Sequence, residues 1–362
     1  MYYLPTRIIY GQNAVKKGFV YINQLGQKAL IVTGKNSAKK SGALDDVTSI
    51  LDSLKIDYEI FDRIDENPVL EIVIEGVQVF IENQCDFLIG IGGGSPIDAA
   101  KAISLAAANN LDINHIYDTA SFKNRFPLVA IPTTAGTGTE ATQYSVLTDA
   151  AKQKKAGFGH DLAFPTLSLV DPGYTLSLSR EVTLNTSIDA LSHLLEGIYS
   201  NKRTPLIYPL IFKGIDLIIK HLPKVLNKLT DIEGRDALMR ASLYGGITIS
   251  HTSTTLQHSI GYPLTSVYNI PHGLANGIVM KQMMSLYYPF VKAELDELFT
   301  YLGISRQNFY DWLDTLGMKT DTKLSTDFIE TKIPEVLASR NMANNPFEIK
   351  AEDVRSLYRS LS

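Results

Sequence analysis

One aspartate and three histidines are the side chains best suited to chemistry in this chain of 362 residues. Asp189 and His193 are four residues apart, which on a helix places a carboxylate and an imidazole on one face. His258 and His272 follow in apolar or glycine-containing segments, where an unpaired imidazole would be costly to bury. Carboxylate oxygens and imidazole nitrogens are common ligands of divalent metals. The four residues therefore predict a divalent-metal site.

A glycine run in the first half of the chain predicts an anion-binding turn. The apolar residues 87–91 lead into glycines 92–94, which let backbone N–H groups approach a ligand closely. We expect Ser95 to be the N-cap of a helix, with Pro96 and Asp98 at its first and third positions. A helix N-terminus behind such a turn suits a pyrophosphate, although a tight turn that binds nothing is the alternative. Gly90 and Gly92 match the first two glycines of the common dinucleotide fingerprint, and Ser95 stands in place of the third.

Four motifs resemble, in the same order, those of the iron-containing (group III) alcohol dehydrogenase family. They span residues 92–98, 132–140, 189–193 and 258–273, so the resemblance covers nearly the whole chain. It implies that the first two motifs hold a nicotinamide cofactor and that Asp189, His193, His258 and His272 are metal ligands at the catalytic centre. It also implies Fe²⁺, whereas the ligand types by themselves accept Zn²⁺ as well.

The elements expected around these motifs form two domains. Short apolar runs alternate with helical patterns in the first half, which predicts a parallel sheet with strands at residues 29–33, 58–61, 87–91, 128–131 and 167–170 and a helix over 71–82. Apolar residues recur at helical spacing from about residue 181 onward, and we expect loops at prolines 205, 209, 223, 263 and 271. The expected organisation is an α/β dinucleotide-binding domain over residues 1–178 and an all-helical metal-binding domain over 179–362, a dehydroquinate synthase-like fold.

The residues after the first expected strand bear on the choice of cofactor. Enzymes that use NAD usually place a carboxylate at this strand end for the ribose hydroxyls. Here Gly34 stands where NAD-preferring relatives often carry aspartate, and Lys35, Ser37 and Lys39 can donate to a 2′-phosphate. This favours NADP(H), with NAD(H) as the alternative, although these lysines could also be ordinary solvated charges.

The family resemblance adds further cofactor contacts. Threonines 133 and 134 follow a strand, at the sheet edge where open α/β folds bind ligands. The resemblance places a leucine and a lysine of the next hairpin nearby, the lysine being Lys154 or Lys155. The expected cofactor-binding residues are Gly34, Lys35, Asn36, Ser37, Asn67, Gly92, Gly93, Gly94, Ser95, Asp98, Thr133, Thr134, Leu147 and Lys154.

Composition favours a soluble enzyme. The net charge of −4 makes neither nucleic acid nor an anionic membrane an obvious partner. The first residues lack the layout of a signal peptide, and no apolar run approaches the roughly 20 residues needed to cross a bilayer, so a cytoplasmic location is expected. The single cysteine, Cys85, cannot form an internal disulfide. A homodimer remains an open possibility.

One residue departs from the family pattern. Many members carry a second histidine four residues after the ligand that matches His258, where it helps to pass a proton to solvent, but this chain has Tyr262. A tyrosine with a pKa of about 10 carries protons poorly at neutral pH. His251 is a candidate substitute, although a structural role for it is the stronger expectation.

The expected function is a metal-dependent, NADP(H)-linked alcohol dehydrogenase or aldehyde reductase that transfers hydride between nicotinamide and a small primary alcohol, diol or aldehyde. We expect the substrate near Gln143, Ser145 and His251. Two alternatives are a dehydroquinate-synthase-like lyase, which would need a basic phosphate pocket that the sequence does not show, and a non-catalytic metal-stabilised binding protein, which would not need the cofactor loop.

Overall fold

The computed structural model describes residues 2–149 and 154–361, and within it the chain divides into two compact units. The sheet unit comprises Tyr3–Ser179 and Leu229–Met239. The helical unit comprises Met1–Tyr2, Arg180–Lys228 and Arg240–Ser362. The sequence predicts a single boundary near residue 178. It does not anticipate that Tyr2 belongs to the helical unit or that Leu229–Met239 belongs to the sheet unit.

The sheet unit is built on six parallel strands in the order β1-β8-β5-β4-β2-β3. Their bounds are β1 (Arg7–Tyr10), β2 (Lys28–Thr33), β3 (Asp57–Phe61), β4 (Phe87–Gly92), β5 (Leu128–Pro132) and β8 (Leu167–Val170). All five expected strands are present. Strand β1 was not expected, because four residues at a partly exposed sheet edge give too short a pattern to separate from a loop.

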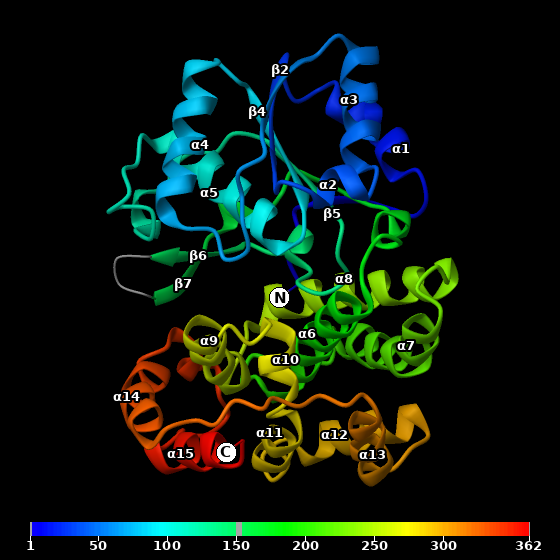
Figure 1. The fold of residues 1–362 in the computed structure, drawn as a ribbon, viewed down its shortest axis with the longest axis vertical. Helices are drawn as coiled ribbons and strands as arrows, with labels where there is room; N and C mark the ends of the chain where they lie inside the picture. Colours follow the sequence, from blue (N-terminus) through cyan, green and yellow to red (C-terminus); the bar gives the residue numbers. More distant parts are fainter. Residues whose placement is uncertain (1, 150–153, 362) are drawn as a thin grey trace. The chain divides into compact units, whose positions relative to one another are not determined.

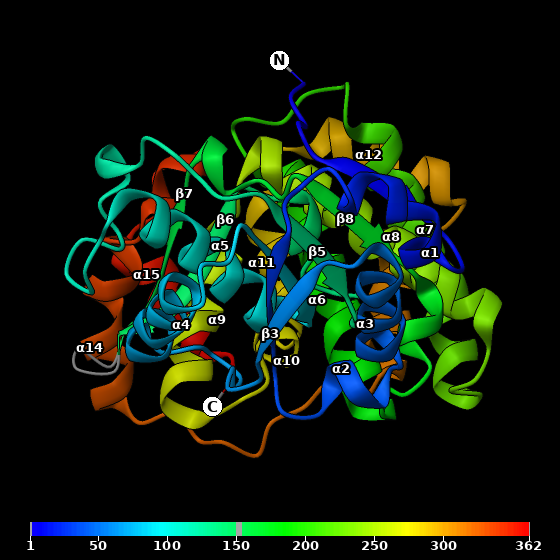
Figure 2. The same ribbon diagram turned by 90° about the horizontal axis from the view of Figure 1, so that it is seen from above.

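Helices cover both faces of this sheet (Figures 1 and 2). They are α1 (Ala14–Ile22), α2 (Ser37–Lys40) and α3 (Ala43–Leu54) on one side, and α4 (Leu70–Glu82) and α5 (Gly94–Asn109) on the other. Because side chains alternate along a strand, Ala29 and Ile31 pack in the core that includes α1 and α3, whereas Leu30 and Val32 pack in the core with α4 and α5. Burial on both faces explains why the central strands are continuous apolar runs.

Smaller elements complete the sheet unit. Strands β6 (Tyr144–Asp149) and β7 (Lys154–Gly159) form an antiparallel pair. Single 3₁₀ turns lie at η1 (Thr119–Ser121), η2 (Thr139–Ala141), η3 (Asp161–Ala163) and η4 (Pro172–Thr175). Among the described residues of the whole chain, no helix has the length and apolar character needed to span a bilayer.

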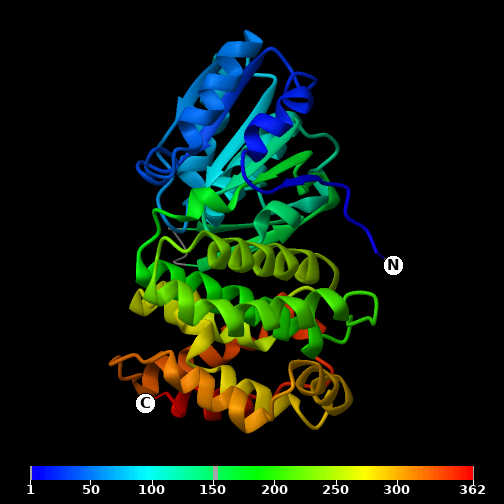
Figure 3. The ribbon, with the colours of Figure 1, turned by 90° about the vertical axis from the view of Figure 1, so that its right-hand side faces the viewer.

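The helical unit confirms the helical spacing expected from about residue 181 onward. Figure 3 shows its helices lying across the view in successive layers. They are α6 (Arg180–Tyr199), α7 (Tyr208–Asn227), α8 (Ile232–Thr252), α9 (Leu256–Tyr268), α10 (His272–Gly277), α11 (Met280–Tyr287), α12 (Lys292–Leu302), α13 (Arg306–Thr315), α14 (Thr326–Leu337), η5 (Arg340–Asn344) and α15 (Ala351–Arg359). The first turns of α8 belong to the sheet unit.

Three of the five prolines expected in loops lie within helices instead. Pro209 is the second residue of α7, a position that tolerates proline. Pro223 is in the last turns of α7, and Pro263 is in the middle of α9. A proline removes one hydrogen bond of the helix ladder and disfavours a helical interior. Pro263 and most residues around it in α9 are buried, so tertiary packing compensates for that loss and the helix continues.

Candidate functional site

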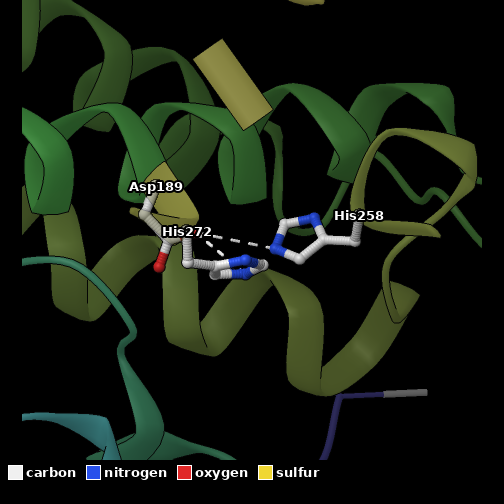
Figure 4. A group of neighbouring side chains, drawn as sticks. All are labelled: Asp189, His258 and His272. Atoms are coloured by element: carbon white, nitrogen blue, oxygen red, sulfur yellow. Dashed lines mark ion pairs between the residues drawn. The ribbon is translucent and has the colours of Figure 1, made fainter. Parts of the chain in front are cut away.

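Three helices bring together three of the predicted metal ligands, as Figure 4 shows. Asp189 comes from the middle of α6, His258 from the first turn of α9, and His272 is the first residue of α10. The Asp189 carboxylate oxygen Oδ1 lies 3.6 Å from His258 Nε2 and 3.7 Å from His272 Nε2. One potential ligand atom from each of the three residues lies within 4.8 Å of the others.

His193 lies beside this group. It is one helical turn after Asp189 on α6, and its Nε2 is 3.9 Å from Asp189 Oδ1. Its ring stacks on that of His258 with centroids 4.8 Å apart. The structure therefore gathers all four predicted ligands within the helical unit.

The donor set fits a divalent transition metal. Two atoms that each lie about 2.1 Å from one ion are roughly 3–4 Å apart, which matches the separations between Asp189 Oδ1 and the histidine nitrogens. One carboxylate oxygen and three imidazole nitrogens suit Fe²⁺ or Zn²⁺. The geometry is compatible with four ligands around one ion, and their assignment as ligands remains a prediction.

Burial and charge act together on these groups. Asp189 is 4% exposed and His258 is 2% exposed. Burial alone would raise the pKa of Asp189, but the charges of His193, His272 and His258 hold it below its usual range. Burial alone would lower the pKa of His258, and the carboxylates of Glu196 and Asp189 raise it to about 9. Two buried carboxylates, Asp189 and Glu196, thus lie against the imidazoles, and their negative charge favours a bound cation.

Glycines on α10 allow it to lie against α6 at the site. A Cβ on Gly273 would fall 1.7 Å from the backbone oxygen of Asn185. A Cβ on Gly277, one turn later, would fall 2.7 Å from the side chain of Ile188. This close backbone approach is what carries His272 to within reach of Asp189.

The sequence interpretation missed two polar residues at the site. Glu196 is fully buried on α6, and its Oε2 pairs with His258 Nδ1. Asn276 on α10 places Nδ2 3.2 Å from Asp189 Oδ1 and 3.4 Å from His272 Nε2. Spacing was the available signal, because Glu196 follows Asp189 by seven residues and Asn276 follows His272 by four, which puts each pair on one helix face.

The two aromatic residues considered for proton transfer have different surroundings. The Tyr262 ring lies parallel to that of His272, with centroids 5.4 Å apart, and meets His258 edge-on. His251 stacks on Tyr2 at 4.4 Å, and its Nδ1 is 2.7 Å from the backbone oxygen of Ile247. One ring nitrogen of His251 is therefore engaged within its own helix, as expected of a structural histidine.

In the sheet unit, the two predicted cofactor loops contact each other at the carboxyl ends of β4 and β5. Gly92 has φ +151°, a conformation that favours glycine. A Cβ on Gly93 would meet the Thr134 side chain at 3.3 Å, and one on Gly94 would meet the Thr137 side chain at 2.9 Å. A side chain at either position would crowd the facing threonine, so glycine favours this approach of the two loops.

The expected start of helix α5 was wrong by two residues. The helix begins at Gly94 with Gly93 as its N-cap, so Ser95 and Pro96 lie inside its first turn and no side chain caps it. The Asp98 carboxylate is used elsewhere, because it accepts hydrogen bonds from Thr139 Oγ1 at 2.5 Å and from the Val146 backbone N–H at 3.0 Å. Tertiary partners decided this carboxylate's role, which is to hold the neighbouring loop.

Other expected cofactor residues gather near the glycine run. The Asn67 N–H donates to Ser95 Oγ at 3.3 Å, and Lys155 Nζ donates to Asn67 Oδ1 at 2.8 Å. Lys154 pairs with Asp149 through its backbone, and its side chain is outside the described part of the structure. Leu147 is fully buried in the hydrophobic core.

Thr133 and Gly34 also bear on the fit of a cofactor. Thr133 Oγ1 is buried and has no hydrogen-bond partner among the described residues, so it is available to a ligand. Together with the glycine approach, this orphaned hydroxyl fits a bound dinucleotide. A Cβ on Gly34 would fall 2.9 Å from the backbone oxygen of Ile64, so this glycine also has a packing role.

The residues beside Gly34 lie at the amino end of α2. Asn36 is the N-cap of this short helix, without a side-chain capping bond, and Ser37 is its first residue. The Lys35 side chain is 64% exposed and pairs with Asp65 at 3.2 Å, and that of Lys39 is 59% exposed and pairs with Asp62 at 3.6 Å. Both lysine charges are thus partly balanced by carboxylates.

Ser145 was expected near the substrate, but its place in the structure is internal. It is fully buried, and its hydroxyl donates to the backbone oxygen of Asp98 at 2.9 Å. The hydroxyl therefore ties β6 to α5.

Comparisons with known proteins agree along the whole chain. The model of iron-containing alcohol dehydrogenase matches residues 5–172, and that of the C-terminal domain of the Fe-containing alcohol dehydrogenase family matches 183–362. An iron-containing alcohol dehydrogenase structure from Thermotoga maritima is 37% identical, with a TM-score of 0.94 over 100% of this chain and 99% of that one. The NAD-dependent methanol dehydrogenase of Bacillus methanolicus is 34% identical over 77% of this chain and 74% of its own length. The NADPH-dependent butanol dehydrogenase of Clostridium saccharobutylicum is 31% identical over 76% and 71%. The chain thus belongs to the iron-containing alcohol dehydrogenase family and is an NAD(P)-dependent oxidoreductase.

Proposed function

We propose that this protein is an NADP(H)-linked alcohol dehydrogenase or aldehyde reductase that uses a divalent metal, Fe²⁺ or Zn²⁺, and acts on small primary alcohols, diols or aldehydes. The observation that carries the proposal is that a ring nitrogen from each of His193, His258 and His272 lies within 3.9 Å of the same Asp189 oxygen. Relatives named for methanol, butanol and 1,3-propanediol support a small alcohol as substrate.

Each of the four side chains has a defined part in the proposed site. Asp189 supplies the negative charge, and the three histidines supply neutral nitrogen donors from separate positions on three helices. A divalent metal bound there supplies Lewis acidity toward an alcohol or carbonyl oxygen. Tyr262, stacked on His272, covers one side of that ligand with an aromatic ring.

The glycine run and the Thr133 loop are the proposed holders of the cofactor. The backbone N–H groups at the start of α5 and the orphaned Thr133 hydroxyl are donors for a diphosphate or a ribose. A nicotinamide cofactor supplies the hydride carrier that these side chains cannot supply themselves. Lys155, held by Asn67, offers a further positive charge at the same sheet edge.

The proposed preference for NADP(H) is supported by Gly34 and by Lys35 and Lys39. A charge-assisted hydrogen bond contributes about 1.5–3 kcal/mol in a favourable setting. Both lysines are more than half exposed and already pair with carboxylates, so solvent reduces their contribution. We therefore expect a preference of roughly tenfold, which corresponds to about 1.4 kcal/mol.

The central experiment incubates the metal-loaded protein with NADPH and a panel of small aldehydes, and follows the absorbance of the reduced nicotinamide. We expect NADPH oxidation with at least one aldehyde, loss of that activity after treatment with a chelator, and recovery when Fe²⁺ or Zn²⁺ is added back. Oxidation that survives complete removal of metal would refute the metal-dependent proposal. Failure of the metal-loaded protein to oxidise NADPH with every aldehyde would refute the reductase.

A second experiment separates the cofactor preference from the reaction. The ratio of kcat/KM for NADPH to that for NADH should fall several-fold in Lys35→Ala and Lys39→Ala, because each removes one charge from the proposed phosphate site. Lys16→Ala removes an exposed lysine of α1 and should leave the ratio unchanged. Equal ratios in all four proteins would show that neither lysine reads the phosphate.

A further inference from the structure

A buried carboxylate beside the four predicted metal ligands has a distinctive set of hydrogen bonds. Glu196 is fully buried on α6, one turn after His193. Its Oε1 accepts from the Thr255 N–H at 2.7 Å, the Thr255 hydroxyl at 2.8 Å and the His258 N–H at 3.3 Å. Its Oε2 pairs with His258 Nδ1. Both oxygens are thus committed to the first turn of α9.

These hydrogen bonds fix the position of the carboxylate. Thr255 is the N-cap of α9, and His258 is its third residue, so Oε1 satisfies backbone donors that the helix itself leaves open. The positive end of the α9 dipole further favours a negative charge at this helix N-terminus. The carboxylate of Glu196 therefore caps α9 and at the same time faces the imidazole of His258.

The contact with Nδ1 has a consequence for the other ring nitrogen. A carboxylate can only accept a hydrogen bond, so Nδ1 carries the proton that the bond requires. In the neutral ring Nε2 is then an acceptor, and the Asn276 Nδ2 donor lies 3.3 Å from it. Nε2 is the nitrogen that lies 3.6 Å from Asp189 Oδ1, so it faces the other predicted metal ligands.

We propose that Glu196 is a positioning residue that holds His258 in the tautomer and orientation in which Nε2 binds the metal. The inference rests on the proposed metal site. Carboxylates that hold metal-bound histidines in this way commonly change metal affinity by about 10–100-fold when they are altered. Glu196 needs no contact with substrate or cofactor for this role.

The amide variant Glu196→Gln tests the inference because it preserves shape and removes one acceptor. If the amide oxygen faces the three donors of α9, the amide NH₂ faces Nδ1, which must then accept, and the ring proton moves to Nε2. If the amide is reversed, its NH₂ meets the backbone donors of Thr255 and His258. Neither arrangement satisfies both sides, so the variant should disfavour the metal-binding tautomer.

The first measurement is the Zn²⁺ affinity of the full chain, by competition with a chromogenic chelator. We expect Glu196→Gln to weaken binding about 10–100-fold. Asp216→Asn is the matched control, since Asp216 is another shielded carboxylate of the helical unit, and it pairs with Lys213 and Lys220 on α7 instead. Its Zn²⁺ affinity should equal that of the wild type.

The second measurement reads the proton directly and needs no Glu196 variant. In the Zn²⁺-loaded wild type labelled with ¹⁵N-histidine, we expect a slowly exchanging, downfield Nδ1 proton that is absent from His258→Gln. A His258 whose Nδ1 binds zinc or lacks a proton would overturn the inference even if Glu196→Gln fails to fold. Wild-type zinc affinity in Glu196→Gln would overturn it as well.

The variant His258→Gln distinguishes a failure of the proposed role of Glu196 from a failure of the proposed metal site. If the ligand assignment holds, His258→Gln weakens zinc binding whatever Glu196 does. If His258→Gln binds zinc as the wild type does, His258 is not a ligand, and both the proposed site and the inference are overturned.

Discussion

Replacement of Gly273 by alanine should move His272 out of reach of the proposed metal ion. Gly273 is the second residue of α10, directly after His272, and its would-be Cβ lies 1.7 Å from the backbone oxygen of Asn185 on α6. A carbon and an oxygen that are not bonded need about 3.3 Å. The start of α10 must therefore move away from α6 by about 1.5 Å, because a backbone oxygen cannot rotate aside as a side chain can.

That movement is large compared with what a metal site tolerates. Ligand distances in such sites vary by about 0.2 Å, so a displacement of His272 by more than 1 Å removes it from the coordination sphere. We expect the affinity for Zn²⁺ or Fe²⁺ to fall by at least about 100-fold, more than for a change outside the ligand set. Overpacking should also cost about 1–3 kcal/mol of the free energy of unfolding.

The assay is chelator competition for the metal, combined with urea unfolding of the same protein. Gly214→Ala is the control, because its Cβ would meet only the flexible end of Leu194, also on α6, at 2.7 Å. It should lose stability without losing metal affinity. Wild-type metal affinity in Gly273→Ala would show that His272 is not a ligand or that α10 is not held against α6 at this residue.

Three further outcomes can be checked. His272→Ala should abolish alcohol oxidation while NADPH binding, followed by its fluorescence, persists, because the ligand lies in the helical unit and the glycine run in the sheet unit; wild-type turnover with unchanged metal content would contradict this. Gly34→Asp should shift the kcat/KM ratio toward NADH, with a lower total activity because its Cβ crowds the backbone oxygen of Ile64 at 2.9 Å; an unchanged ratio would show that Gly34 does not face the ribose. Burial raises the pKa of Glu140 from 4.5 to about 7, so its contribution to stability is complete below pH 4.5 and is lost as the pH rises through 7. Glu140→Gln should therefore be more stable than the wild type by about 1–3 kcal/mol at pH 8 and not at pH 4.5, measured by urea unfolding, and an equal difference at both pH values would contradict the raised pKa.

The sequence by itself determined most of the architecture. The central strands were visible as short apolar runs because both faces of the sheet are covered by helices, which leaves no polar alternation to obscure them. The pair Asp189 and His193 was visible because a spacing of four residues on a helix is a local geometric fact. Local spacing also contained Glu196 and Asn276, although nothing in it showed which face of the helix is the inner one.

Only the tertiary structure decided how distant segments meet. It brings α6, α9 and α10 together at one point, through contacts between residues nearly 90 positions apart such as Asp189 and Asn276. It gives the Asp98 carboxylate to Thr139 and Val146 instead of to its own helix terminus. It also keeps Pro263 within α9, because burial of the surrounding helix outweighs one missing hydrogen bond.

The physical reason is the range of the interactions involved. Strand pattern, helix spacing and glycine turns depend on neighbours within a few residues, so the linear sequence contains them. The tautomer of His258, the approach of Gly273 to Asn185 and the partner of Lys155 depend on side chains that share no local segment. Such contacts exist only once the chain has folded. They decide whether residues of suitable type come close enough to form a site.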